Sequence, residues 1–118
     1  MKLVQSFSFE AAHRLPAVPP EHRCYKLHGH SYRVDLKLTG PVDASTGFVV
    51  DFFDIEDAFK PVLAMLDHQY LNEIDGLQNP TVENIAVWIW QRIKPALPLL
   101  STIIVYETKD SWVEYDGS

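Results

Sequence analysis

Cysteine is almost absent from this sequence, since Cys24 is the only one among 118 residues. A single thiol excludes an intrachain disulfide framework, so the fold depends on its hydrophobic core. The chain also has no run of Lys or Arg, and its formal net charge is -6. This charge balance argues against a nucleic-acid partner, but it leaves room for a local basic pocket that binds an anionic small molecule.

Long apolar runs are missing as well. No stretch approaches the roughly 18 apolar residues that span a bilayer, and acidic Glu10 interrupts the N-terminal segment where a signal peptide would be apolar. We therefore expect a soluble, cytoplasmic protein that does not bind a membrane. Hydrophobic residues make up 47% of the chain, and its length predicts one domain over residues 1–118.

Hydrophobic periodicity predicts seven elements in the order strand, strand, strand, helix, helix, strand, strand. Strands are expected where apolar residues alternate, and helices where they recur every three or four positions. The expected elements cover residues 3–13, 28–39, 48–51, 52–66, 80–95, 100–107 and 112–115. This order is typical of an α+β fold in which helices pack on an antiparallel sheet.

Three histidines fall on one face of the first two expected strands. His28 and His30 are two residues apart, so both rings project from the same apolar face, and His13 ends the matching face of the preceding strand. If the two strands form a hairpin, the three imidazoles meet at one end of the sheet. Three such ligands with a vacant fourth position are typical of catalytic zinc. The alternative is that backbone hydrogen bonds satisfy these rings.

Other residues that can carry chemistry each allow more than one interpretation. Cys24 can be a base or nucleophile beside a cation, a fourth ligand of a closed zinc site, or a small buried hydrophobe. Asp67 can orient His68, or His68 can simply interact with the end of a helix. Glu107 can bind a ligand edge with two N–H donors, or be a solvated strand end. No role is assigned to His22.

Six segments, which span nearly the whole chain, resemble the 6-pyruvoyl-tetrahydropterin synthase family in the family's order. They are FSFEAAHRLP (7–16), CYKLHGHSY (24–32), TGFVVDF (46–52), LDHQYLN (66–72), NPTVENIA (79–86) and VYET (105–108). The match is closest to the bacterial 6-carboxy-5,6,7,8-tetrahydropterin synthase branch of queuosine biosynthesis. Cys24 stands four residues before His28 as in that branch, whereas animal pyruvoyl-forming enzymes have two further residues there. A folate-synthesis branch has Glu in place of Cys24.

The resemblance implies specific roles for the residues in these segments. The implied zinc ligands are His13, His28 and His30. Cys24 would be the general base, and His68 with its partner Asp67 would be the second proton-transfer group. Glu107 would anchor the pterin and could join the proton relay, and Thr81 would also bind the substrate.

The implied reaction converts 7,8-dihydroneopterin triphosphate to 6-carboxy-5,6,7,8-tetrahydropterin and releases triphosphate and acetaldehyde. The triphosphate needs cationic partners, for which Arg14, Arg23 and Lys26 are candidates. Two alternatives remain open. One is pyruvoyl-tetrahydropterin formation from the same substrate, and the other is a zinc- or pterin-binding protein without catalysis, in which Cys24 is a structural ligand.

The resemblance also implies an architecture, the tunnelling fold. In this fold an antiparallel four-stranded sheet carries two helices on one face, and subunits join edge to edge into a barrel. Two trimers then stack into a homohexamer. By this analogy the active site lies between subunits, and Glu107 and the zinc would come from different chains.

Overall fold

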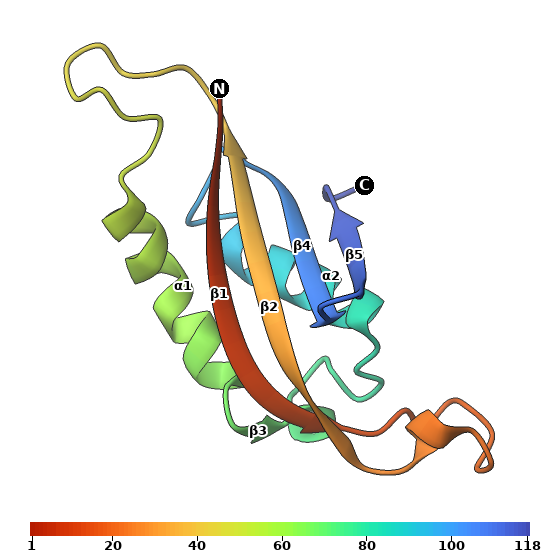
Figure 1. Cartoon of the computed structure of the whole chain (residues 1–118). Helices are drawn as coiled ribbons and strands as arrows, with labels where there is room; N and C mark the ends of the chain where they lie inside the picture. Colours follow the sequence, from red (N-terminus) through yellow and green to blue (C-terminus); the bar gives the residue numbers. More distant parts are fainter.

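A long, bent ribbon of two strands forms the centre of the computed structural model, which describes residues 1–118 (Figure 1). β1 (Lys2–His13) and β2 (His28–Thr39) pair antiparallel along their whole lengths, from Lys2 opposite Thr39 to His13 opposite His28. Alternation of apolar and polar residues explains both strands, because one face of each is buried. The expected hairpin of these two strands is therefore confirmed.

The sheet has five strands in the order β3-β1-β2-β4-β5. β4 (Leu100–Thr108) pairs antiparallel with β2, and β5 (Ser111–Tyr115) forms a hairpin with β4. The two-residue β3 (Gln69–Tyr70) pairs parallel with β1 at Ala11 and Ala12. The expectation of a four-stranded antiparallel sheet thus describes the four longer strands, but β3 makes the whole sheet five-stranded and mixed.

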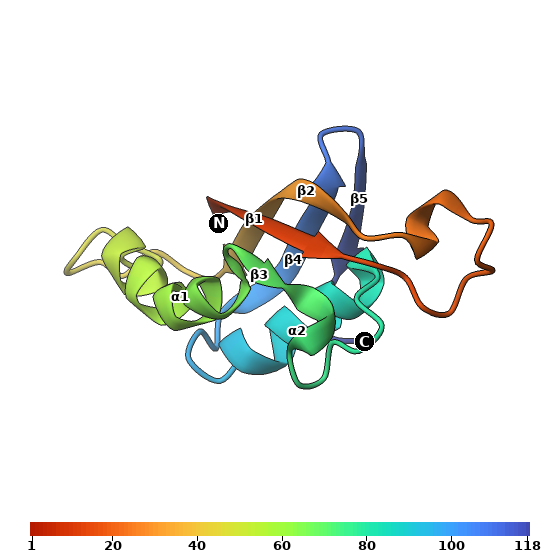
Figure 2. The same ribbon diagram turned by 90° about the horizontal axis from the view of Figure 1, so that it is seen from below.

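Two helices lie on the same side of this sheet, α1 (Phe52–Leu66) and α2 (Val82–Ile93) (Figure 2). Their apolar stripes and the inward face of the strands form one hydrophobic core. Asp51 caps α1 by accepting the backbone N–H of Phe53, and Thr81 caps α2 by accepting that of Asn84. Neither helix is long and apolar enough to cross a membrane.

The strand expected at residues 48–51 does not form, and this prediction is wrong. The segment lies in the connection between β2 and α1, without a neighbouring strand. Val50 packs against the core, Asp51 serves as the cap of α1, and Phe48 is half exposed. An apolar run of this length needs a partner edge to become a strand, and the helix that starts at Phe52 ends the extended stretch first.

Candidate metal centre and its surroundings

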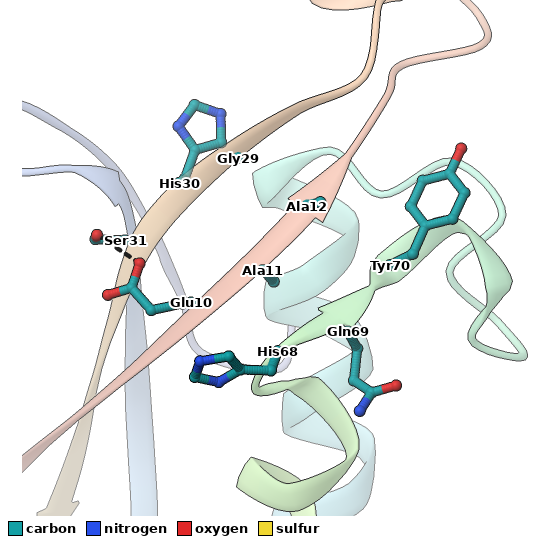
Figure 3. Close-up of a pocket in the computed structure, with 9 residues that line it drawn as sticks. All are labelled: Glu10, Ala11, Ala12, Gly29, His30, Ser31, His68, Gln69 and Tyr70. Atoms are coloured by element: carbon teal, nitrogen blue, oxygen red, sulfur yellow. Dashed lines mark hydrogen bonds between the residues drawn. The ribbon is translucent and has the colours of Figure 1, made fainter.

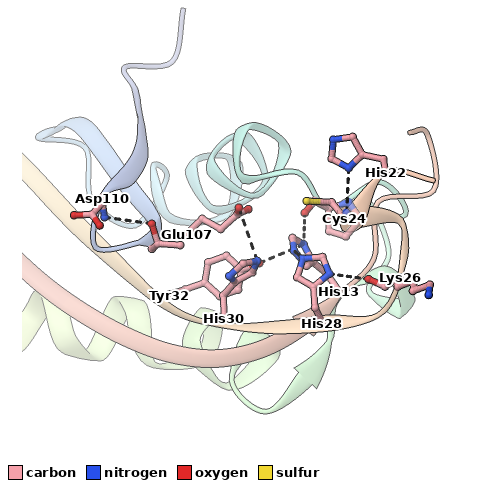
Figure 4. Close-up of polar contacts among 11 residues, drawn as sticks. His13, His22, Cys24, Lys26, His28, His30, Tyr32, Glu107 and Asp110 are labelled. Atoms are coloured by element: carbon pink, nitrogen blue, oxygen red, sulfur yellow. Dashed lines mark hydrogen bonds and ion pairs between the residues drawn. The ribbon is translucent and has the colours of Figure 1, made fainter. Parts of the chain in front are cut away.

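The three histidines meet at one end of the β1–β2 ribbon, on the face that carries the helices (Figure 4). His13 lies opposite His28 in the ladder, and His30 lies opposite Ala11, which is two residues before His13. One ring nitrogen from each residue falls within 4.8 Å of those of the other two. His13 is completely buried, whereas the other two rings are partly exposed.

Backbone carbonyls fix the tautomers of two of these rings. Nδ1 of His13 lies 2.8 Å from the carbonyl oxygen of Pro80, and Nδ1 of His28 lies 2.7 Å from that of Lys26. Because a carbonyl oxygen only accepts, each Nδ1 carries the hydrogen and each neutral ring has its lone pair on Nε2. These two Nε2 atoms are 2.9 Å apart. Two lone pairs at this distance repel each other unless a proton or a metal ion lies between them.

His30 adds a third unsatisfied nitrogen. Its Nε2 atom is buried and has no hydrogen-bond partner. Burial lowers the pKa of His13 and of His30, and the neighbouring imidazoles lower both further, whereas Glu107 acts in the opposite direction. Both rings therefore favour the neutral form, which is the form that binds a metal. An all-imidazole set of this kind fits Zn²⁺.

Glu107, near the end of β4, approaches the same cluster from the neighbouring strand. Its Oε1 atom is 3.8 Å from Nε2 of His30, and the carboxylate is three-quarters buried. Glu107 and the three histidines therefore lie close together within one chain, and the sharing of the site between chains stays a prediction. The Glu107 carboxylate, which can accept N–H donors, thus lies beside the candidate metal centre.

Cys24 lies in the 3-10 helix η1 (Arg23–Tyr25), within the loop that joins His13 to His28. It is a free, partly exposed thiol without a hydrogen-bond partner, and Figure 4 shows it on the side of the rings away from Glu107. Its sulfur does not belong to the group of converging ligand atoms. Cys24 therefore lies outside the set of candidate ligands, which argues against a closed metal site with four protein ligands.

Asp67 and His68 form a pair at the opposite edge of β1. Oδ2 of Asp67 is 3.0 Å from Nδ1 of His68, and Oδ1 of Asp67 accepts the backbone N–H of Glu10 at 2.9 Å. The N–H of Glu10, followed by the His68 imidazole, lowers the pKa of Asp67. His68 donates its own N–H to the carbonyl of Glu10 and adopts a left-handed backbone (φ 59°). His68 is mostly exposed.

The histidine cluster and the Asp67–His68 pair are not brought together within one chain. β1 lies between them, because His68 bonds to its outer edge while His30 is on β2. Adjacent strands are roughly 4.8 Å apart, so two strand spacings separate the backbones. Figure 3 shows His30 and His68 on opposite sides of β1. Both residues contribute to the lining of a hollow of about 520 Å³.

The other expected site residues have the following contacts. Thr81 uses its Oγ1 atom as the cap of α2, accepting the N–H of Asn84 at 3.1 Å, and it keeps a hydroxyl hydrogen for a ligand. Arg14 packs over the Tyr25 ring at 4.6 Å and donates through Nε to the Tyr25 carbonyl. The side chains of Arg23 and Lys26 are exposed and make no hydrogen bond or ion pair.

Sequence reasoning missed the acceptors that organise the histidines. In the sequence, Pro80 is only the first residue of an expected helix and Lys26 only a candidate cation, yet each binds an imidazole through its carbonyl. A backbone oxygen leaves no signal in sequence. Tyr32 was also missed: it is fully buried, its hydroxyl lies 3.3 Å from Nδ1 of His13, and it stacks on Phe9. Its parity with His28 and His30 was the available signal.

Comparisons with known proteins agree with this geometry. The family model of 6-pyruvoyl tetrahydropterin synthase matches residues 2–118. A 6-carboxy-5,6,7,8-tetrahydropterin synthase from Synechocystis sp. is 41% identical and is covered to 91%, with 96% of this chain aligned. A dihydroneopterin monophosphate aldolase from Pyrococcus furiosus is 33% identical, with 98% of this chain and 96% of the relative aligned.

The fold is also similar to that of a protein of known structure. The 6-pyruvoyl tetrahydropterin synthase of Caenorhabditis elegans superposes with a TM-score of 0.93 at 27% identity, over 100% of this chain and 96% of that chain. The family match covers residues 2–118, including every segment that carries a site residue. This chain belongs to the 6-pyruvoyl tetrahydropterin synthase family.

Proposed function

We propose that this protein is a zinc-dependent lyase that converts 7,8-dihydroneopterin triphosphate and water to 6-carboxy-5,6,7,8-tetrahydropterin, triphosphate and acetaldehyde, in queuosine biosynthesis. The observation that carries the proposal is the pair of lone-pair nitrogens on His13 and His28, 2.9 Å apart and completed by the unpartnered Nε2 of His30. The spacing of Cys24 before His28 and the similarity to the Synechocystis synthase favour the carboxy-forming reaction.

Each residue of the chain has a defined task in this proposal. Bound Zn²⁺ would supply Lewis acidity toward the side-chain oxygens of the pterin. Cys24 removes a proton from the side-chain carbon that carries these oxygens, and the His68 imidazole, oriented by Asp67, transfers a second proton. The Glu107 carboxylate accepts two N–H groups from the pterin edge, a bidentate geometry that carboxylates favour. Thr81 donates its free hydroxyl hydrogen to the substrate.

We further propose that the complete site forms between subunits of a homohexamer. The observation that supports this arrangement is the separation of His68 from the metal ligands by β1, because one chain alone does not present both proton-transfer groups to one substrate. The sheet also has unpaired outer edges at β5 and along β1 beyond β3, which favours strand pairing with another copy. A barrel of trimers stacked in pairs would bury these edges.

Product analysis tests the proposed reaction. Zinc-loaded protein is incubated with 7,8-dihydroneopterin triphosphate, and the pterin product, triphosphate and acetaldehyde are measured by mass spectrometry and coupled assays. Formation of 6-carboxytetrahydropterin with equal amounts of the other two products supports the proposal. Pyruvoyl-tetrahydropterin as the main product would assign the pyruvoyl-forming reaction instead.

Two controls separate the remaining alternatives. Dihydroneopterin monophosphate is offered in parallel, since the Pyrococcus relative carries the name of an aldolase for that compound. X-ray absorption of the zinc-loaded protein then reports the ligand atoms. A sulfur ligand together with no turnover of either substrate would support a closed, non-catalytic zinc site that includes Cys24. A shell of nitrogen and oxygen only would reject it.

A further inference from the structure

His22, the one histidine without a role so far, binds the backbone of Cys24. Its Nδ1 atom accepts the N–H of Cys24 at 3.0 Å, which makes His22 the N-cap of η1 (Figure 4). A ring nitrogen that accepts a hydrogen bond carries no hydrogen of its own, so the ring hydrogen of the neutral form is on Nε2. His22 is exposed, and its ring makes no other hydrogen bond and no ion pair. The only hydrogen bond of the ring is therefore the one to Cys24.

The second polar group of the Cys24 backbone is held as well. The carbonyl of Cys24 accepts the N–H of Leu15 at 2.9 Å, which ties the middle of the loop back to the chain just after β1. The loop closes on itself around this point, because the N–H of Tyr25 bonds to the carbonyl of His22 and the N–H of His22 bonds to that of Pro19. Both backbone groups of Cys24 are thus fixed, while its thiol stays free.

The kind of residue that forms this cap is unusual. Ser, Thr, Asp and Asn are the usual N-caps, and they accept the same backbone hydrogen bond. η1 is only three residues long and buries none of them, so its own packing does not hold it in place. Loss of the His22 bond would therefore free the N–H of Cys24 and let the thiol move relative to the histidine cluster.

From these contacts we propose that His22 is the positioning residue of Cys24. Through its bond to the backbone N–H of Cys24, it fixes where the thiol lies relative to the three histidines. The proposal rests on the proposed role of Cys24 as the base. A displacement of about 1 Å at a reacting group can lower a rate by about 100-fold. The bond is made to Cys24 and not to a zinc ligand, so we expect its loss to affect kcat more than KM or zinc content.

Three variants test this role in the zinc-loaded protein. His22→Ala removes the acceptor, His22→Asn restores an acceptor of the usual N-cap type, and Glu21→Ala is the matched control, because Glu21 is exposed and makes no hydrogen bond. We expect kcat to fall on the order of 10- to 100-fold in His22→Ala with KM and zinc content unchanged. His22→Asn and Glu21→Ala should stay within about threefold of the unmodified protein.

A second readout does not need the substrate. Cys24 is the only cysteine, so the rate of alkylation by iodoacetamide reports on this thiol alone. At about pH 9.5, above the ordinary thiol pKa of about 8.5, the rate depends on exposure more than on ionisation. A released loop should react several-fold faster in His22→Ala, while His22→Asn should react like the unmodified protein.

The outcomes are distinct. Unchanged kcat and alkylation in His22→Ala would overturn the positioning role, and so would a His22→Asn variant as impaired as His22→Ala. If the unmodified protein has no activity, the proposed function fails, and the alkylation rates still decide whether His22 positions Cys24.

Discussion

Asp67 binds the side chain of His68 with one carboxylate oxygen and the backbone of β1 with the other. The 3.0 Å approach to Nδ1 leaves Nε2 as the exposed end of the imidazole, and the 2.9 Å bond to Glu10 fixes the carboxylate against a strand. The pair is thus built like the orienting half of a catalytic triad. It faces away from the metal ligands of its own chain, so its substrate would be held by another copy.

Complementation between two inactive variants tests this arrangement. Cys24→Ala and His68→Ala should each lose activity by about 100- to 10,000-fold, the usual contribution of a general acid or base. When both are coexpressed, a site between subunits can draw an intact Cys24 from one chain and an intact His68 from another. Random mixing of such interfaces should restore about a quarter of the full activity. No recovery in oligomers shown to be mixed would place both residues in one chain's site.

Removal of single residues should separate metal binding from catalysis. We expect Cys24→Ala to keep its zinc, because the sulfur does not belong to the converging group. His28→Ala should lose zinc affinity by more than the roughly 10- to 100-fold that loss of an outer partner costs. Metal content by mass spectrometry and the visible spectrum of the cobalt-substituted protein measure both. Zinc loss in Cys24→Ala would contradict the assignment of Cys24 as a base.

Thr81 has two functions that substitutions can separate. Thr81→Ala should destabilise the protein by about 1 kcal/mol through loss of the α2 cap, and should raise KM about threefold to tenfold through loss of a substrate hydrogen bond. Thr81→Ser should restore both properties. Thr81→Asn should restore the cap only, so thermal stability would recover while KM stays high. Equal KM values in all variants would restrict Thr81 to its structural function.

We expect Asp35, which is not part of the candidate metal centre, to make a contribution to the stability of the fold that is lost in acid. Burial raises the pKa of this carboxyl group, but hydrogen bonds from Arg33 (2.8 and 2.9 Å) and Ser6 (2.6 Å) outweigh it and lower the pKa overall. Because the pKa of this group is lower in the folded than in the unfolded state, the carboxylate stabilises the fold at pH values above the unfolded-state pKa of about 3.9. This stabilisation is lost as the pH falls through the folded-state pKa.

Asp35→Asn should therefore destabilise the zinc-free protein by roughly 1.5–3 kcal/mol at neutral pH. The gap in Tm between the two proteins should narrow as the pH falls from about 5 to about 3. Thermal unfolding followed by circular dichroism at several pH values measures this gap, and Lys2→Ala, an exposed change at the end of the sheet, is the control. A gap that is constant with pH would show that the charge of Asp35 does not contribute.

Strand parity was enough to predict the histidine cluster, because side chains two apart on paired strands must meet. Nothing comparable marks β3: Gln69 and Tyr70 carry no alternation, and the parallel pairing follows from where α1 ends rather than from the two residues themselves. The same is true of the Asp67–His68 pair, whose partners are the backbone groups of Glu10. The residue types of the site can be read from sequence, but their distribution over the two sides of β1 cannot.

The pairing of His13 with His28 in the ladder has a consequence for how the metal acts on the fold. In small zinc-finger domains, the ion closes the chain on itself and folding depends on it. Here the strand ladder has already closed the loop between the two ligands, so the ion has little chain entropy left to remove. The metal-free protein should thus keep its architecture, and zinc should act as an exchangeable cofactor of a preorganised cavity.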